Sequence, residues 1–312
     1  MPPRLCEFCG KKKPAVKRIR TPSKVCSDCF ILLFEEDVFN TVAKHNVFER
    51  GDVVGIGLSG GKDSVVMSYC LQALNIKHNW DVNFVFVCID EGISGYRDDS
   101  IETVRFVAQD LDLPLHIFSF KDLYEHSMDE ICGKLGTKQS CSHCGVLRRK
   151  ALNHACQEIG ITKMCIGHNA DDVGETLLLN FLRCDVNRLS NSTTVVTGDV
   201  ITRIKPLLEV TQKDIILYAF HRRLRYFSTE CPYACDAFRG VPREMIQMLT
   251  TNIPSAVFNL ITTGDQVQAM VEQQRPTKPR EWGECEGCGT QVSKRVSLCS
   301  YCMLMRNMSD DD

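Results

Sequence analysis

Hydrophobic positions between residues 53 and 183 alternate between short apolar runs and longer segments with one apolar face. Short apolar runs predict buried strands, and apolar residues spaced three and four apart predict helices. The expected strands are 53–58, 83–89, 115–118 and 164–166, and the expected helices are 63–74, 100–111, 145–159 and 172–183. Because strands and helices take turns, we expect an α/β fold with a doubly wound parallel sheet. Ligands of such sheets bind at the carboxyl ends of the strands.

Composition narrows the class of protein. Apolar residues make up 44% and charged residues 24%, and the net charge of −2 excludes a polycation that holds nucleic acid by charge alone. No apolar run reaches 18 residues and the first 20 residues lack an apolar core, so we expect neither a membrane span nor secretion. The 18 cysteines are therefore interpreted as metal ligands or reactive thiols rather than as disulfides.

Paired cysteines stand near both ends of the chain. Each end carries two CxxC pairs: Cys6, Cys9, Cys26 and Cys29, then Cys285, Cys288, Cys299 and Cys302. Four thiolates complete a closed tetrahedral shell, so each set predicts a structural zinc finger, against the alternative of eight cysteines spaced so by accident. Residues 1–30 hold eight Lys and Arg against two acids, a local charge of +6. That charge fits either contact with phosphates or a solvated face, whereas the second set is interpreted as structural.

A glycine-rich loop follows the first expected strand, which ends near Gly57. It runs directly into a helix and reads Ser59, Gly60, Gly61, Lys62, Asp63, Ser64. Successive backbone N–H groups and a helix N-terminus favour a bound phosphate. The loop is not a Walker A motif, because Ile56 and Asp63 occupy two of its required positions. We expect the two serines to donate to a departing pyrophosphate, Lys62 to neutralise it and Asp63 to hold Mg²⁺.

Two further strand ends carry carboxylates. Gly167 opens a loop that ends in Asp171 and Asp172, which suit metal contact or proton transfer, although both also fit as ordinary acids at a helix N-terminus. The segment Asp90, Glu91, Gly92, at the end of the second strand, is expected to meet the nucleoside of ATP.

A third CxxC, Cys141 and Cys144, has no second pair nearby. Its expected companion is Cys231, with Cys235 as a rival. Three thiolates leave a metal centre one position short, which is typical of a reactive site. The alternatives are a redox disulfide and a third zinc site that uses His143. Basic residues flank the cysteines: Arg148, Arg149, Lys150, Arg222, Arg223 and Arg225. They would lower the pKa of nearby thiols or bind a polyanionic substrate, or they merely form solvated faces. The remaining assigned cysteines are expected in the core: Cys70, Cys88, Cys132, Cys156, Cys165 and Cys184.

The loop from Ser59 to Ser64 matches the SGGxDS loop of the PP-loop ATP pyrophosphatases. Together with the central cysteines and the two fingers, it resembles the tRNA 2-thiolation enzymes of the two-thiocytidine and two-thiouridine synthetase superfamily over nearly the whole chain. The stretches 94–100, 167–172 and 226–231 look closest to the eukaryotic and archaeal branch. This resemblance implies an enzyme, a tRNA-uridine 2-sulfurtransferase. ATP adenylates the C2 oxygen of uridine, at the wobble position of cytoplasmic tRNAs, and a sulfur nucleophile then displaces AMP.

The resemblance also implies cofactors, partners and roles. Cys141, Cys144 and Cys231 would hold an iron–sulfur cluster of the 4Fe-4S type. These cysteines, Asp63 and Asp171 are the expected catalytic residues, and the expected cofactors are ATP, magnesium, two structural zinc ions and the cluster. The implied partners are tRNA, a ubiquitin-like sulfur carrier protein and a related second thiolation subunit. A homodimer is one further assembly that it allows, and the expected location is cytoplasmic and away from membranes.

Three parts of the chain are expected: an N-terminal zinc finger (1–34), a PP-loop ATP-binding catalytic domain with the central cysteine site (35–272), and a linker with the C-terminal zinc finger (273–312). Within the last part, residues 273–280 have the composition of an exposed linker. Competing functions are a zinc-ribbon tRNA-binding scaffold with a vestigial nucleotide loop, thiolation at another tRNA position, and an adenylating amidotransferase. The last lacks a recognisable glutaminase segment.

Overall fold

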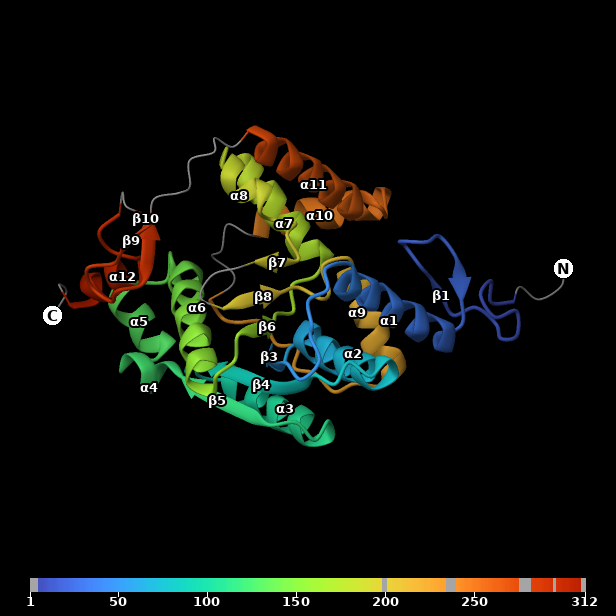
Figure 1. The fold of residues 1–312 in the computed structure, drawn as a ribbon, viewed down its shortest axis with the longest axis horizontal. Helices are drawn as coiled ribbons and strands as arrows, with labels where there is room; N and C mark the ends of the chain where they lie inside the picture. The colour runs from blue at the N-terminus through green and yellow to red at the C-terminus, as the bar shows by residue number, and fades with distance from the viewer. Residues whose placement is uncertain (1–4, 198–200, 234–239, 275–281, 294–295, 310–312) are drawn as a thin grey trace.

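The computed structural model describes residues 5–197, 201–233, 240–274, 282–293 and 296–309, and its centre is a six-stranded sheet (Figure 1). The strand order is β5-β4-β3-β6-β8-β7, and every neighbouring pair is parallel except β7 with β8. The strands are β3 (Val53–Gly57), β4 (Asn83–Asp90), β5 (Leu115–Ser119), β6 (Lys163–Cys165), β7 (Val196–Thr197) and β8 (Thr202–Ile204). The expected α/β fold is confirmed, with one antiparallel strand at its edge.

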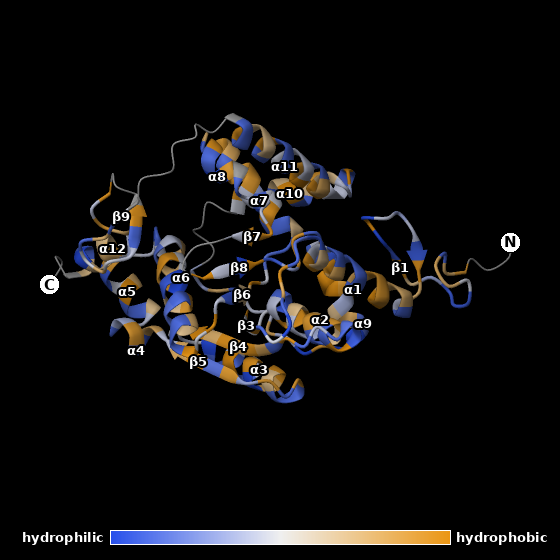
Figure 2. Cartoon of the chain, in the orientation of Figure 1, coloured by the Kyte–Doolittle hydropathy of each residue, from blue (hydrophilic) through white to orange (hydrophobic). Residues whose placement is uncertain are grey.

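Helices cover both faces of this sheet because its strands are apolar on both sides. In β4, Phe84 and Phe86 enter one core while Val85 and Val87 enter the other, as the two-residue period of a strand requires. The first core is closed by α2 (Lys62–His78), α3 (Arg97–Asp110) and α9 (Gln212–Arg222). The second is closed by α4 (Phe120–Tyr124), α5 (Met128–Leu135) and α6 (Ser140–Ile159). Figure 2 shows helices that are apolar along one side and polar along the other.

Four helices form a separate group beyond the sheet: α7 (Ala170–Leu182), α8 (Val186–Ser190), α10 (Gly240–Asn252) and α11 (Ala256–Gln274). Glycines permit their close approach, since a Cβ on Gly264 would lie 2.9 Å from a methyl group of Leu177. Of the expected linker, residues 273–274 end α11 and the rest lies outside the described residues. In the described part of the chain, no helix is both long and apolar enough to span a bilayer.

The two cysteine-rich segments lie at opposite ends of the molecule (Figure 1). The first comprises β1 (Val16–Lys17), β2 (Lys24–Val25) and the start of α1 (Ser27–Lys44), and the second comprises β9 (Trp282–Glu284), β10 (Gln291–Ser293) and α12 (Ser300–Ser309). Helix α1 continues from the first segment onto α9, where Tyr218 donates a 2.8 Å hydrogen bond to buried Glu35. Helix α12 packs on α5 and α6, and its Leu304 and Met308 join the second core.

Two local expectations are wrong. Helix α6 begins at Ser140 rather than near Gly145, so Cys141 and Cys144 lie in its first turns instead of in a preceding loop. Cys184 is exposed, not in the core, because it stands just beyond the end of α7 with φ of +54°, where the chain turns towards α8. The other cysteines assigned to the core are buried.

Candidate active site

Two loops from strands that are neighbours in the sheet form the centre of the site. Strands β4 and β5 lie on one side of β3 and β6 lies on the other, so the order of the strands reverses between β3 and β6. This is the position where doubly wound sheets bind ligands. The loop after β6 touches the loop after β3 closely, because a Cβ on Gly167 would lie only 3.2 Å from the Ser64 nitrogen.

The loop after β3 is shaped by its own hydroxyl groups. Ser64 Oγ donates to the Gly61 carbonyl at 3.0 Å, accepts from the Ser59 backbone N–H at 3.2 Å, and lies 3.1 Å from Ser59 Oγ. Gly60 has φ of +79°, and a Cβ there would lie 2.6 Å from the Ser100 carbonyl oxygen. These contacts hold the backbone in a tight turn at the N-terminus of α2, which is the geometry of a phosphate cradle.

Asp63 is positioned from both loops. Lys62 Nζ lies 3.1 Å from Asp63 Oδ2, and the Asn169 side-chain amide donates to Asp63 Oδ1 at 3.0 Å. Asn169 was absent from the residues predicted from sequence. The Asn-x-x-Asp spacing of a helix cap was visible, but its contact with Asp63 depends on the order of the strands.

Asp171 and Asp172 play different structural parts. Asp172 forms a capping box with Asn169 at the start of α7, so the helix-cap interpretation holds for it. Asp171 accepts the Gln212 backbone N–H at the start of α9 at 2.7 Å, and burial raises the pKa of its carboxyl. The predicted catalytic role of Asp171 stays a prediction. Asp90 ends β4, and its Oδ1 accepts the Gly92 N–H at 2.9 Å.

The chain segment before Cys231 connects the cysteines to the phosphate loop. Phe227 donates its backbone N–H to the Gly60 carbonyl at 2.8 Å and forms a parallel bridge with Gly61. Its ring packs edge-on against Tyr96, with 5.3 Å between ring centroids. Only three residues lie between Phe227 and Cys231, so this segment leads from the loop after β3 to the third cysteine.

Cys141, Cys144 and Cys231 lie near one another, but their three sulfurs do not form one compact group. Cys141 Sγ lies 3.4 Å from the Tyr233 carbonyl, two residues beyond Cys231. Burial raises the pKa of Cys144 to about 11, and it raises that of Cys231 too. The negative charges of Cys231 and Cys141 add to the rise at Cys144, and that of Cys141 adds to the rise at Cys231. Among the described residues, the groups whose ligand atoms all lie within 4.8 Å of one another are the two four-cysteine sets, and these three thiols are not such a group. Such spacing does not favour a third zinc site with His143 and suits thiols bound to separate irons of one cluster. Cys235, the rival ligand, lies outside the described residues.

Both four-cysteine sets share one geometry. Cys9 and Cys26 sulfurs are 3.9 Å apart and Cys288 and Cys299 sulfurs 3.7 Å apart, close to the ~3.8 Å expected for two sulfurs on a tetrahedral ion with 2.3 Å bonds. In each set the backbone N–H of the third cysteine donates to the sulfur of the first at 3.2 Å. Burial opposes ionisation of Cys6, but N–H groups of Cys9 and Cys26 outweigh it and lower the Cys6 pKa to about 6. Both sets fit a metal ion.

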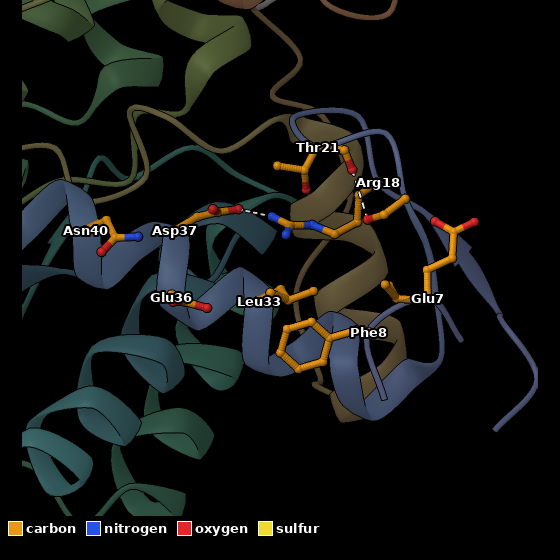
Figure 3. Close-up of a pocket in the computed structure, with 10 residues that line it drawn as sticks. Glu7, Phe8, Arg18, Thr21, Leu33, Glu36, Asp37 and Asn40 are labelled. Atoms are coloured by element: carbon orange, nitrogen blue, oxygen red, sulfur yellow. Dashed lines mark hydrogen bonds and ion pairs between the residues drawn. The ribbon is translucent and has the colours of Figure 1, made fainter. Parts of the chain in front are cut away.

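A cavity of about 280 Å³ lies where the first finger meets α1 (Figure 3). Arg18 from the finger forms an ion pair with Asp37 of α1 there, and Leu33 and Phe8 lie on its apolar side. This cavity marks the joint between the first finger and α1.

The fold and its loops define a class of nucleotide-binding protein, the PP-loop class, and the PP-loop domain model matches residues 35–248. "Cytoplasmic tRNA 2-thiolation protein 1" of Candida glabrata is 43% identical over 310 residues, covering 97% of this chain and 86% of the relative. The protein of the same name from Oryza sativa is 42% identical over 98% of this chain and 83% of its own.

A solved structure is similar to this chain over nearly its full length. The U34-tRNA thiolase NcsA from Methanococcus maripaludis, determined with its 4Fe-4S cluster, has a TM-score of 0.83 and 30% identity, and the match covers 98% of this chain and 97% of that one. The chain belongs to the PP-loop family of cytoplasmic tRNA 2-thiolation proteins.

Proposed function

We propose that the protein catalyses ATP-dependent 2-thiolation of uridine in tRNA, at the wobble position of cytoplasmic tRNAs. One observation carries the proposal: the segment that pairs with the phosphate loop at Gly60 and Gly61 leads directly to Cys231. A site for activating an oxygen with ATP therefore adjoins a site of three thiols. Thiolation requires both, because the C2 oxygen must become a leaving group before sulfur replaces it.

In the first step, the uridine C2 oxygen attacks the α-phosphorus of ATP, and the bond to pyrophosphate breaks. Backbone N–H groups of the loop and the N-terminus of α2 would hold the phosphates, and Lys62 would offset the charge on the pyrophosphate. Asp63 faces both loops and would hold Mg²⁺, oriented by Asn169. Uridine N3 loses its proton in the first step. In the second step, sulfur at the sulfide level, HS⁻, attacks C2, the bond from C2 to oxygen breaks, AMP leaves with the former C2 oxygen, and the sulfide proton passes to N3.

The three central cysteines fit a 4Fe-4S cluster, because they offer three thiols whose sulfurs are not all within 4.8 Å of one another, as ligands of one zinc ion would be. Cys141, Cys144 and Cys231 would hold it, and it would supply an iron with an open position for sulfur. Arg148 Nη2 lies 3.5 Å from Cys144 Sγ and would stabilise negative charge on that sulfur. The proposal also includes zinc ions in the two end sets, a ubiquitin-like sulfur carrier, a related second subunit and self-association.

The test is nucleoside mass spectrometry of tRNA from cells depleted of the protein and complemented with variants, with the anticodon fragment measured separately. Asp63→Asn and Cys144→Ser should fail to restore wobble 2-thiouridine, whereas Cys184→Ser, which alters an exposed cysteine away from the site, should restore it. Restoration by Asp63→Asn would favour the scaffold function. If depletion removes 2-thiouridine at another position instead, the protein thiolates that position and not the wobble uridine.

A further inference from the structure

Glu91 is a buried carboxylate with no part in the mechanism above. It follows Asp90 at the end of β4, and its side chain is 5% exposed. A buried charge is costly unless it is paired, and Glu91 is paired twice. Arg97 Nε lies 3.0 Å from its Oε2, and Arg148 Nε lies 2.7 Å from its Oε1.

The two arginines differ in how firmly they are held. Arg97 is buried, and its Nη2 donates to the Ile89 carbonyl at 2.6 Å and to Cys88 Sγ at 3.2 Å. The Glu91 backbone is fixed as well, since its carbonyl accepts the Met128 N–H at 2.8 Å. Arg97 and Glu91 therefore form a rigid unit attached to β4.

Arg148 is the arginine whose place depends on Glu91. Its side chain is 50% exposed, reaches from α6, and contacts the Glu91 carboxylate and the Cys144 sulfur. An arginine with half of its surface in water has many alternative rotamers, and ordering it costs conformational entropy. The Glu91 carboxylate fixes Nε, which leaves Nη2 directed at Cys144.

We propose that Glu91 is a positioning residue that holds the Arg148 guanidinium against Cys144, so that the end of β4 fixes the geometry of the cysteine site. Its neighbour Asp90 belongs to the same strand end, and its Oδ1 lies 3.7 Å from Arg97 Nε, so Arg97 joins both carboxylates of this strand end. This inference rests on the proposed function for its catalytic consequence but not for the placement of Arg148.

The placement is tested on cluster-free protein without tRNA. Phenylglyoxal modifies accessible guanidinium groups, and peptide mass spectrometry reports the rate at Arg148. Glu91→Gln should raise that rate by about fivefold or more, because the charge of the ion pair with Arg148 is lost. The matched control is Glu102→Gln, which makes the same change in an exposed ion pair with Arg225. Its Arg148 rate should equal that of the wild type, and an unchanged rate in Glu91→Gln would overturn the proposal.

The catalytic consequence is tested by measuring pyrophosphate release and thiolated product in one turnover. Glu91→Gln and Arg148→Met should each lower product formation about tenfold while leaving pyrophosphate release nearly unchanged, and the double variant should be no worse than either single one. An equal loss in both steps, or additive losses, would indicate a merely structural ion pair.

Folding and function are separated by two further comparisons. Glu91→Asp keeps the charge and shortens the reach, so it should give an intermediate Arg148 rate even if Glu91→Gln fails to fold. If wild-type protein forms no thiolated nucleoside at all, the proposed function fails, whereas the modification rates still decide whether Glu91 positions Arg148.

Discussion

Replacing Gly60 by alanine should disable the phosphate loop. Its φ of +79° is left-handed, which costs an alanine about 1–2 kcal/mol. The new Cβ would lie 2.6 Å from the Ser100 carbonyl oxygen, and that oxygen belongs to the backbone of α3, so it cannot rotate aside. The loop must shift instead, which breaks the 2.8 Å hydrogen bond from Phe227 N–H to the Gly60 carbonyl, a loss of about 1 kcal/mol.

Together these effects amount to about 3 kcal/mol, or roughly a 100-fold loss if all of it falls on nucleotide binding. Isothermal titration with Mg-ATP measures the affinity. If the free-energy cost falls on the fold instead, calorimetry should show the unfolding temperature falling by about 6 °C, at about 2 °C per kcal/mol for a chain of this size.

The control for unfolding is Gly61→Ala. Gly61 has φ of −73°, and its new Cβ would meet only Ser59 Oγ, at 3.6 Å. That contact is an ordinary one, so the unfolding temperature should hardly change. Equal unfolding temperatures together with equal ATP affinities for the two variants would refute the argument from backbone strain.

Three further predictions concern stability. Tyr218→Phe should lower the free energy of unfolding by about 1–3 kcal/mol in denaturant titrations, because buried Glu35 loses a 2.8 Å hydrogen bond; no change would mean that water replaces the hydroxyl. Gly264→Ala should destabilise by about 1–3 kcal/mol, since its Cβ would lie 2.6 Å from a Thr193 methyl carbon, whereas Gly133→Ala, with open space, should not; calorimetry of both variants decides. Burial lowers the pKa of Lys205 to about 8 from 10.5. Between these two pH values the unfolded chain holds a proton that the folded amine has lost, so the free energy of unfolding should rise with pH. Compared with Lys205→Met, the wild-type protein should gain up to about 3 kcal/mol. A difference in urea unfolding that does not depend on pH would contradict this prediction.

The sheet and its first loop were predictable because local pattern decides them. Continuous apolar runs such as that in β4 are buried on both faces, and a glycine-rich turn before a helix has few other uses. The end sets were equally readable, since four cysteines in two pairs specify their own geometry.

What escaped prediction depends on contacts between distant segments. Asn169 meets Asp63 only because β6 lies beside β3, and Glu91 meets Arg148 only because α6 crosses the end of β4. The prediction that Cys184 is buried was wrong for a different reason. The apolar residues before it, Phe181 and Leu182, are themselves exposed, so an apolar neighbourhood in sequence did not mean burial.

The positions of the two cysteine sets suggest why both occur in one chain. The first is joined through α1 to α9, whose first N–H donates to Asp171 of the loop after β6. The second is joined to α6, where Lys150 Nζ lies 3.0 Å from Thr290 Oγ1, two turns along the helix from Cys144. Each set therefore packs against a different helix. The first supports α9, beside the loop after β6, and the second supports α6, which carries Cys141 and Cys144. A closed four-cysteine metal site resists deformation more than a small apolar core does, so metal ions in both sets would hold fixed the distance that the proposed sulfur transfer requires.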